Sequence, residues 1–340
     1  MRTADFDYHL PPEHIAQRPA EPRDSSKLLV LDRSSGACSH HVFHDLPSLL
    51  SPGDALVLNQ TRVIAARLHG AKIPSGGKVE LLLIQREEER IWQVMVGGRG
   101  LRPGVRIAIP EGPEAEILTD LGGSLRRVRF EEAITPQLDR LGEMPLPPYI
   151  HTPLQHNDEY QTVFASHPGS AAAPTAGLHF TPHLLQEIET RGVSLVWVTL
   201  HLGLDTFVPV TVDDPEQHPI HREWCRLTPQ AANAINATRQ DGGRIVTVGT
   251  TTVRTLETAA RAADPDQVVA PFEGFSDLFI LPGFDFQAVD RMLTNFHLPR
   301  STLLMMIAAF AGRDLVLQTY QTAIQESYRF YSFGDAMLIL

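Results

Sequence analysis

The sequence predicts an α/β domain that is interrupted by a smaller all-β domain. Apolar runs typical of buried strands alternate with helix signals before residue 60 and again after residue 146. Between these parts lie about six short β-prone segments, separated by Gly- and Pro-containing turns and without a helical pattern. Because α/β patterns flank the all-β stretch on both sides, we interpret the β domain as an insertion.

Length and composition agree with a folded chain of about two domains. The 340 residues are 43% hydrophobic, which is enough for a sizeable core. The N-terminal residues are not typical of a signal peptide, and no apolar run reaches the roughly 18 residues of a membrane span. Cys38 and Cys225 show no paired spacing, so we expect a reducing cytosol and not a disulfide framework.

The first part of the chain contains two predicted buried strands, at 27–32 and 54–59, with a turn at Pro52-Gly53 before the second. From Arg62 the pattern changes to short β-prone segments. These segments lie at 63–68, 78–85, 92–96, 105–109, 115–118 and 126–130. Their number and spacing predict a small barrel or sandwich.

Helix and strand signals return after residue 146. Thr181 is typical of a helix cap and Pro182 of a first helical position, so a helix is expected to about residue 191. Ser301 and Thr302 are expected to cap a helix at 303–311. The other expected elements are helices at 229–239, 250–263 and 314–326, strands at 193–200, 244–248 and 336–340, and an edge strand at 279–281.

Charge is distributed unevenly along the chain. The net charge of −11 argues against a protein that binds nucleic acid over its whole surface, but it leaves room for a local basic face. Residues 60–106 hold nine Arg or Lys and four Asp or Glu, a balance of +5, whereas residues 205–290 hold six Arg and thirteen acidic residues, a balance of −7. These segments are either ordinary solvated faces or a polyanion-binding module beside an acidic one.

Three histidines, His179, His201 and His297, lie where an apolar run changes into a short polar loop. Imidazole titrates near neutral pH, and α/β folds place their chemistry on loops at strand ends, so the three loops suggest one composite site. A structural hydrogen-bonding role is the alternative for each histidine. Their spacing lacks the short-range ligand pair that commonly begins a zinc site, which favours acid–base or hydrogen-bonding roles over metal binding.

The clearest anion-binding candidate is the segment 244–254, in which a buried strand is expected to run through Gly249 into a helix. Thr250 and Thr251 lie in the first turn of that helix, where free N–H groups and the helix dipole suit a carboxylate or a phosphate. Arg254, about one turn further, would add a bidentate contact. An ordinary threonine cap with a structural pair between Arg254 and Glu257 is the alternative.

Two polar segments near the C-terminus are further binding candidates. The loop at 295–302 combines Asn295, His297 and Arg300 with two hydroxyls beside an apolar helix, and such a loop is costly to bury unless its groups are paired. The segment 327–335 interleaves aromatic residues with an arginine and a Gly turn, which suits either stacking on nucleobases or an aromatic core. Cys225 is not expected to be catalytic.

Motifs along nearly the whole chain support a more specific assignment. They include Ala-Pro-Thr-Ala-Gly-Leu-His-Phe at 173–180, Val-Gly-Thr-Thr-Thr-Val-Arg-Thr-Leu-Glu at 248–257 and Tyr-Arg-Phe-Tyr-Ser-Phe-Gly-Asp-Ala-Met at 328–337. Others lie at 7–13, 23–32, 52–63, 142–150, 160–165, 200–203 and 294–304. In this order the segments resemble the S-adenosylmethionine:tRNA ribosyltransferase-isomerase family of queuosine biosynthesis. Gln60, Ala65 and the segment 220–225 depart from the pattern expected for that family.

The resemblance implies a fold class and a reaction. The family architecture is a three-layer α/β domain, expected here at 1–60 and 146–340, with an inserted small β-barrel domain, expected here at 61–145. In the family reaction the ribosyl moiety of S-adenosylmethionine is transferred to 7-aminomethyl-7-deazaguanine at the wobble position of tRNA and is isomerised. The product is epoxyqueuosine in tRNA, and adenine and methionine leave. No metal or redox cofactor is implied.

The same resemblance suggests roles for particular side chains. Proton transfer is assigned to a pool of His179, His201 and His297. The carboxylate or ribose of the donor is expected at Thr250, Thr251 and Arg254. The transferred group or the target base is expected near Asn295, Arg300, Tyr328 and Asp335. The tRNA backbone is expected on the basic β segment, at Arg62, Arg67, Lys72, Lys78, Arg99, Arg102 and Arg106.

The expected partners are S-adenosylmethionine, as a co-substrate and not a regenerated cofactor, and tRNA with a GUN anticodon that carries the aminomethyl base. We expect a cytoplasmic monomer without a membrane partner. Two other classes stay open at this stage: an S-adenosylmethionine-dependent RNA methyltransferase and a non-catalytic RNA-binding protein. The first would need a Gly-rich strand–loop motif that the sequence lacks, and the second would not need the polar loops of the α/β part.

Overall fold

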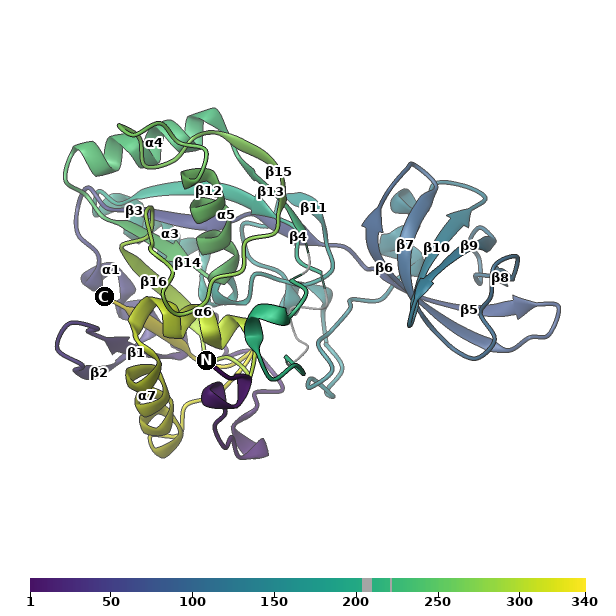
Figure 1. The fold of residues 1–340 in the computed structure, drawn as a ribbon, viewed down its shortest axis with the longest axis horizontal. Helices are drawn as coiled ribbons and strands as arrows, with labels where there is room; N and C mark the ends of the chain where they lie inside the picture. The colour runs from purple at the N-terminus through teal and green to yellow at the C-terminus, as the bar shows by residue number, and fades with distance from the viewer. Residues whose placement is uncertain (204–209, 221) are drawn as a thin grey trace. The chain divides into compact units, whose positions relative to one another are not determined.

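The computed structural model describes residues 1–203, 210–220 and 222–340, which divide into two units (Figure 1). The first unit comprises Met1–Arg62, Pro148–His167 and Ala173–Leu340, and it contains a large mixed sheet with helices. The second comprises Val63–Pro147 and Pro168–Ala172, and it contains a closed β-barrel. The expected α/β fold class with a small barrel is therefore confirmed, and of the two alternatives for the β segment the barrel is correct.

The described part of the first unit contains a nine-stranded sheet in the order β15-β13-β12-β3-β14-β16-β17-β1-β2. Four neighbouring strands, β12, β3, β14 and β16, are parallel, whereas β17 and β1 run in the opposite direction. The strands are β1 (Lys27–Leu31), β2 (Cys38–Val42), β3 (Ala55–Asn59), β12 (Ser194–Leu200), β13 (Glu223–Leu227), β14 (Ile245–Val248), β15 (Phe272–Ser276), β16 (Arg291–Asn295) and β17 (Ala336–Ile339).

Both faces of this sheet are covered by helices, which gives the expected three layers. On β3, Leu56 and Leu58 belong to a core shared with α3 (Pro182–Thr190) and α1 (Leu46–Leu49). The alternate residues Ala55 and Val57 pack with α4 (Pro229–Gln240) and α5 (Thr250–Ala260). The strands β1 and β17 contribute alternate residues to a further cluster with α6 (Thr302–Ala311) and α7 (Arg313–Gln325). Burial on both faces explains why these strands are continuous apolar runs.

The helix starts follow the expected capping chemistry. Thr181 Oγ1 accepts a hydrogen bond from the backbone N–H of Leu184 (3.2 Å), and Pro182 occupies the first position of α3. Ser301 Oγ accepts from the N–H of Leu304 (3.2 Å) at the start of α6. Short helices that complete the inventory are α2 (Leu138–Leu141) and the 3-10 turns η1 (Thr3–Phe6), η2 (Pro12–His14), η3 (Arg23–Ser25), η4 (Phe43–Asp45), η5 (Thr135–Gln137), η6 (Asn157–Tyr160), η7 (Thr175–His179) and η9 (Pro215–Gln217).

The expected edge strand is wrong, and the expected β segment 63–68 is interrupted, because residues 64–66 form no strand. Residues 279–281 form no strand, and the edge of the sheet is β15 instead. The segment is apolar because it packs against the core that contains α6. Ile280 is buried in that core, and Phe279 and Leu281 are partly buried against it. The true edge strand Phe272–Ser276 was not predicted, since its burial alternates and a glycine interrupts it.

The barrel of the second unit closes in the order β10-β7-β6-β5-β8-β9. Its strands are β5 (Arg67–Ile73), β6 (Lys78–Arg86), β7 (Ile91–Gly97), β8 (Arg106–Ala108), β9 (Ala115–Gly122) and β10 (Leu125–Phe130). Buried inward-facing residues such as Leu68, Val94 and Val128 fill the interior. A Cβ at Gly70 would lie 2.7 Å from Ile107 Cγ2, so a glycine permits the close approach of β5 and β8.

The strands β4 (Thr61–Val63) and β11 (His167–Ser170) form a separate two-stranded sheet. Among the described residues, no single helix is long and apolar enough to cross a membrane. Only α6 and α7 taken together, bent by 112° at the break between them, pass that test of length and composition.

Candidate active site

The polar loops of the first unit meet at one edge of its sheet. The parallel strands β3, β12, β14 and β16 end there, and the opposed strands β17 and β1 begin there. Asn59, His201 and Asn295 therefore lie at the same edge as Ser26 and Asp335, although they are far apart in the sequence. In α/β sheets, ligands bind outside the carboxyl ends of the strands.

A small pocket opens at this edge of the sheet. Of the candidate site residues, Thr250, Thr251, Asn295 and His297 line it. The other lining residues are Ala173, Pro174, Thr175, Ala176, Leu202, Gly249, Thr294 and Leu303. The pocket thus combines a helix start, an amide and an imidazole in a mostly apolar wall.

The helix start in the pocket is the N-terminus of α5. Gly249 has φ 86°, a conformation that favours glycine, and it allows the sharp change of direction from β14 into the helix. Thr251 Oγ1 accepts a hydrogen bond from Asn59 Nδ2 (3.2 Å), which holds this turn against the end of β3. The free backbone N–H groups of the first turn and the helix dipole make this end of the pocket suited to an anionic group.

His297 is the histidine that lines the pocket among the three candidates. Its Nε2 is 2.8 Å from Thr294 Oγ1, and its backbone N–H donates to Tyr320 Oη (3.0 Å). The backbone carbonyl of His297 accepts a hydrogen bond from Tyr8 Oη. Burial lowers the pKa of His297 to about 3, so the ring is neutral at physiological pH. Thr294 holds the ring at Nε2, and the two tyrosines hold the backbone of His297.

His179 lies at the end of η7, and both of its ring nitrogens have partners. Nδ1 is 2.7 Å from Ser26 Oγ, and Nε2 is 3.3 Å from Asn295 Nδ2. The ring stacks on Phe43, with centroids 4.8 Å apart. Burial, together with the nearby charge of Arg329, lowers the pKa of His179 to about 3.

His201 follows β12 and is less buried than the other two histidines. Its Nδ1 is 2.8 Å from Thr61 Oγ1, and its ring stacks on Trp224 with centroids 5.1 Å apart. Burial lowers the pKa of His201 to about 4. The neighbouring Leu202 lines the pocket, so His201 lies beside the pocket wall.

Arg254 does not lie in this pocket with Thr250 and Thr251. It forms a buried ion pair with Glu223 of β13, and both residues line a second pocket of about 530 Å³. Apolar side chains such as Leu278 and Met306 line much of that second pocket, and Leu303 lines both pockets. The buried Glu223 partner was not predicted, because β13 was not recognised as a strand.

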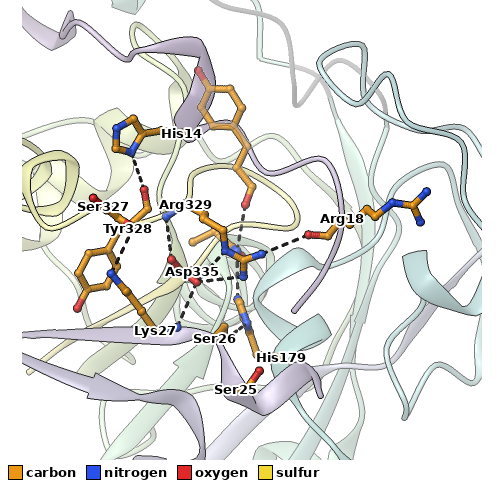
Figure 2. Close-up of polar contacts among 12 residues, drawn as sticks. His14, Arg18, Ser25, Ser26, Lys27, His179, Ser327, Tyr328, Arg329 and Asp335 are labelled. Atoms are coloured by element: carbon orange, nitrogen blue, oxygen red, sulfur yellow. Dashed lines mark hydrogen bonds and ion pairs between the residues drawn. The ribbon is translucent and has the colours of Figure 1, made fainter. Parts of the chain in front are cut away.

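Tyr328 and Asp335 are engaged within the protein. Asp335 Oδ1 accepts from the backbone N–H of Lys27 (3.1 Å) and from Arg329 Nη2 (3.1 Å), and Figure 2 shows this carboxylate between the two residues. Tyr328 Oη is 2.8 Å from His40 Nδ1, and its carbonyl is 2.9 Å from His14 Nδ1. Both side chains therefore shape the sheet edge without lining the pocket.

Arg300 is exposed, and its Nε is 3.4 Å from Asp7 Oδ2. It is not among the residues that line the pocket, so the structure places it apart from Asn295 and His297. Burial raises the pKa of Cys225 to about 12, which agrees with the expectation that this thiol is not a nucleophile. His221 lies outside the described residues, and within these residues no group of three His, Cys, Asp or Glu is placed to hold a metal ion.

The basic candidates of the β segment differ in their partners. Arg67 is paired with Glu80, and Arg106 is paired with Glu114 and Glu131. Lys72 Nζ donates to the carbonyl of Arg99 (2.8 Å). The described residues offer no carboxylate partner to Arg62, Lys78, Arg99 or Arg102, which are exposed. On the barrel, Lys72 lies near the end of β5, Lys78 begins β6, and Arg99 and Arg102 lie on the β7–β8 loop. We call these four residues the basic rim.

Comparisons with known proteins cover the whole chain. The sequence model described as queuosine biosynthesis protein matches residues 3–339. An S-adenosylmethionine:tRNA ribosyltransferase-isomerase from Symbiobacterium thermophilum is 53% identical, and one from Moorella thermoacetica is 51% identical, with 100% of each chain covered. A crystal structure of S-adenosylmethionine tRNA ribosyltransferase from Thermotoga maritima is 41% identical and superposes with a TM-score of 0.58 over 99% of this chain and 100% of that chain.

Proposed function

Because the chain belongs to the queuosine biosynthesis protein family, we propose that it is an S-adenosylmethionine:tRNA ribosyltransferase-isomerase. It transfers the ribosyl moiety of S-adenosylmethionine to 7-aminomethyl-7-deazaguanine in tRNA and isomerises it, giving epoxyqueuosine, adenine and methionine. The observation that carries the proposal is the pocket at the sheet edge, where Thr250, Asn295 and His297 come together. These groups supply an anion-binding helix start, a hydrogen-bonding amide and a ring that can exchange a proton.

The reaction needs proton transfer at two points. A base removes the acidic C5′ proton beside the sulfonium, and an acid assists the departure of adenine. His297 is the first candidate for one of these steps because its ring lines the pocket and is neutral at physiological pH. His201, beside the pocket wall, is the second candidate.

The donor needs a site for its charged and polar groups. The N-terminus of α5, with Thr250 and Thr251, suits a carboxylate or the ribose hydroxyls of S-adenosylmethionine. Arg254 is paired with Glu223 and lines the second pocket. A contact between Arg254 and the donor is therefore made from the second pocket and not from the pocket that contains Thr250. Asp335 and Tyr328, whose polar atoms have protein partners, support the sheet edge.

The tRNA needs a basic surface, since phosphate contacts dominate the affinity for nucleic acid. We assign that role on the barrel to the basic rim, whose cations are not neutralised by carboxylates among the described residues. Arg62, which is exposed, is a candidate for an additional phosphate contact. Arg300 is exposed as well, but it is paired with Asp7. The target base must be unstacked to react, at a cost of a few kcal/mol.

The finer expectations belong to the same proposal. The tRNA carries a GUN anticodon, the protein is a cytoplasmic monomer, and no metal or redox cofactor takes part. Size-exclusion chromatography with light scattering tests the oligomeric state. Activity after exhaustive dialysis against a chelator tests the metal requirement.

Product analysis tests the activity itself. The protein is incubated with S-adenosylmethionine and tRNA that bears the aminomethyl base, and the control is the same tRNA with an unmodified guanine. We expect adenine and methionine in equal amounts, with epoxyqueuosine in the tRNA and no product in the control. S-adenosylhomocysteine would identify a methyltransferase, and binding without any product would identify an RNA-binding protein.

A further inference from the structure

The pocket contains a buried hydrogen-bond acceptor that no group among the described residues satisfies. Asn295 is 1% exposed and lines the pocket, and its Oδ1 has no hydrogen-bond partner in the described structure. A buried acceptor left in this state destabilises the empty pocket. Such a group at a pocket wall indicates a donor that arrives with a ligand.

The orientation of the Asn295 amide is fixed by its two other contacts. Nδ2 donates to the backbone carbonyl of Tyr331 (3.2 Å) and lies 3.3 Å from His179 Nε2. A backbone carbonyl can only accept, so the NH2 group must face Tyr331. Consequently Oδ1 is the atom that remains for a ligand, and a flipped amide would lose the contact with Tyr331.

The same contacts fix the tautomer of His179. Because both N–H bonds of the amide are donors, His179 Nε2 must accept and carry no proton. Nδ1 of the neutral ring then carries the proton and donates it to Ser26 Oγ, 2.7 Å away. Ser26 is 2% exposed, and Phe43 stacks on the imidazole, so this arrangement has no freedom to rotate. Figure 2 shows Ser26 and His179 in contact below the guanidinium of Arg329.

We propose that Ser26 and His179 position the amide of Asn295, and that Asn295 Oδ1 accepts a hydrogen bond from an O–H or N–H donor of the adenosyl part of S-adenosylmethionine. This inference rests on the proposed function. His179 is a positioning residue and not a proton-transfer group, because neither ring nitrogen faces a substrate. Asn295 is the residue that touches the ligand, and an acceptor-only atom selects for a ligand donor at this point.

Binding of adenosine analogues to the intact protein tests which donor is involved. Isothermal titration calorimetry compares adenosine with 2′-deoxyadenosine, 3′-deoxyadenosine and purine riboside, which lacks the amino group of adenine. We expect one analogue to bind the wild type about 10-fold to 100-fold more weakly than adenosine. The analogue that loses affinity identifies a ribose hydroxyl or the adenine amine as the donor.

Two variants test whether Asn295 accepts the hydrogen bond from that donor and whether Ser26 and His179 position the Asn295 amide. N295L removes the acceptor, so it should bind adenosine as weakly as the wild type binds the deficient analogue, and it should no longer distinguish the two. S26A leaves Asn295 intact but loosens His179, and we expect a partial loss of the same discrimination. S25A is the matched control, because the neighbouring Ser25 is exposed and its Oγ donates only to the carbonyl of Pro22.

The outcomes separate this inference from the proposed function. If N295L still distinguishes adenosine from its analogues as the wild type does, with an unchanged melting temperature, the proposed role of Asn295 is wrong. The proposed ribosyl transfer is not affected by that result. The same holds if the wild type itself does not distinguish the analogues. If the wild type does not bind S-adenosylmethionine at all, both fail. For H179N, an unchanged shape of the pH–rate profile supports the positioning role, and loss of one limb of that profile contradicts it.

Discussion

Removal of charge from the basic rim of the barrel should weaken tRNA binding in a way that depends on salt. The perturbation is the triple variant K78Q/R99Q/R102Q, since these exposed cations have no carboxylate partner among the described residues. Each phosphate contact contributes a slope of about −0.7 to −0.9 to the plot of log K against log salt concentration. Three contacts therefore account for a slope of about −2.1 to −2.7. Relative to 1 M salt, this corresponds to roughly 50-fold to 170-fold in affinity at 0.15 M salt.

Fluorescence anisotropy with labelled tRNA at several salt concentrations measures both quantities. The matched control is R127Q/R129Q/R140Q, three arginines of the same unit that are already paired with Glu87, Glu116 and Glu111. Arg129 and Arg140 are exposed, and Arg127 is half-buried. Because these carboxylates neutralise the control cations, the control should change the slope little. If the rim variant keeps the wild-type slope and affinity, or if both variants lose the same amount, the basic rim does not bind the tRNA backbone.

Three further predictions concern stability and reactivity. Burial lowers the pKa of His179 and His297 to about 3, so the unfolded state binds more protons below pH 6.5, and stability is complete above that pH. We expect the free energy of unfolding to fall by about 1.4 kcal/mol per pH unit per histidine between about pH 6 and the folded-state pKa of about 3. Urea titrations in that range that give equal slopes for the wild type and H179Q/H297Q would contradict this. Iodoacetamide at pH 8 should label the exposed Cys38 and leave Cys225, whose pKa burial raises to about 12, unlabelled in mass spectra of the native protein. D54A should lower the free energy of unfolding by about 3 kcal/mol, because the buried Asp54 accepts bonds from an arginine side chain and from two backbone N–H groups, and a loss below 1 kcal/mol would refute that role.

The parts of the fold that the sequence predicts are those with strong local signals. The strands β1, β3, β12 and β17 are apolar runs because helices cover both faces of the sheet. The caps at Thr181 and Ser301 are visible because a hydroxyl precedes each helical run. The strands β2, β13, β15 and β16 were not predicted. β2, β13 and β15 lie toward the sheet margins and mix polar with apolar residues. β16 is central in the sheet, but its apolar run consists of Met292 and Leu293 alone, which is too short to indicate a strand.

In the candidate site too, the residues that were predicted are those that a local sequence pattern identifies. The helix start at Thr250 and the loop of Asn295 and His297 were recognised from local patterns, and the structure brings them into one pocket. The contact between Ser26 and His179 joins residues 153 positions apart. It follows from the order of strands in the sheet, in which β17 lies between β16 and β1 and the beginning of β1 shares one edge with the ends of β14 and β16. No local pattern contains that order.

The partners of charged residues were also beyond local patterns. Arg254 was expected near the donor because it follows the helix start by one turn, but it is paired with Glu223 from an unrecognised strand. Asp335 was expected near the substrate, but its carboxylate binds Arg329 and the backbone of Lys27. A buried charge requires a partner, and which partner it finds depends on tertiary structure.

The single-turnover rate of H297A with tRNA and S-adenosylmethionine already bound tests most directly whether the pocket at the sheet edge is the catalytic site. H183A is the matched control, since His183 is an exposed histidine of α3. Loss of a positioned proton-transfer group should slow adenine release by about 10²- to 10⁴-fold in H297A, with S-adenosylmethionine still bound, and H183A should keep the wild-type rate. A wild-type single-turnover rate for H297A would contradict the assignment of proton transfer to His297 and of catalysis to this pocket.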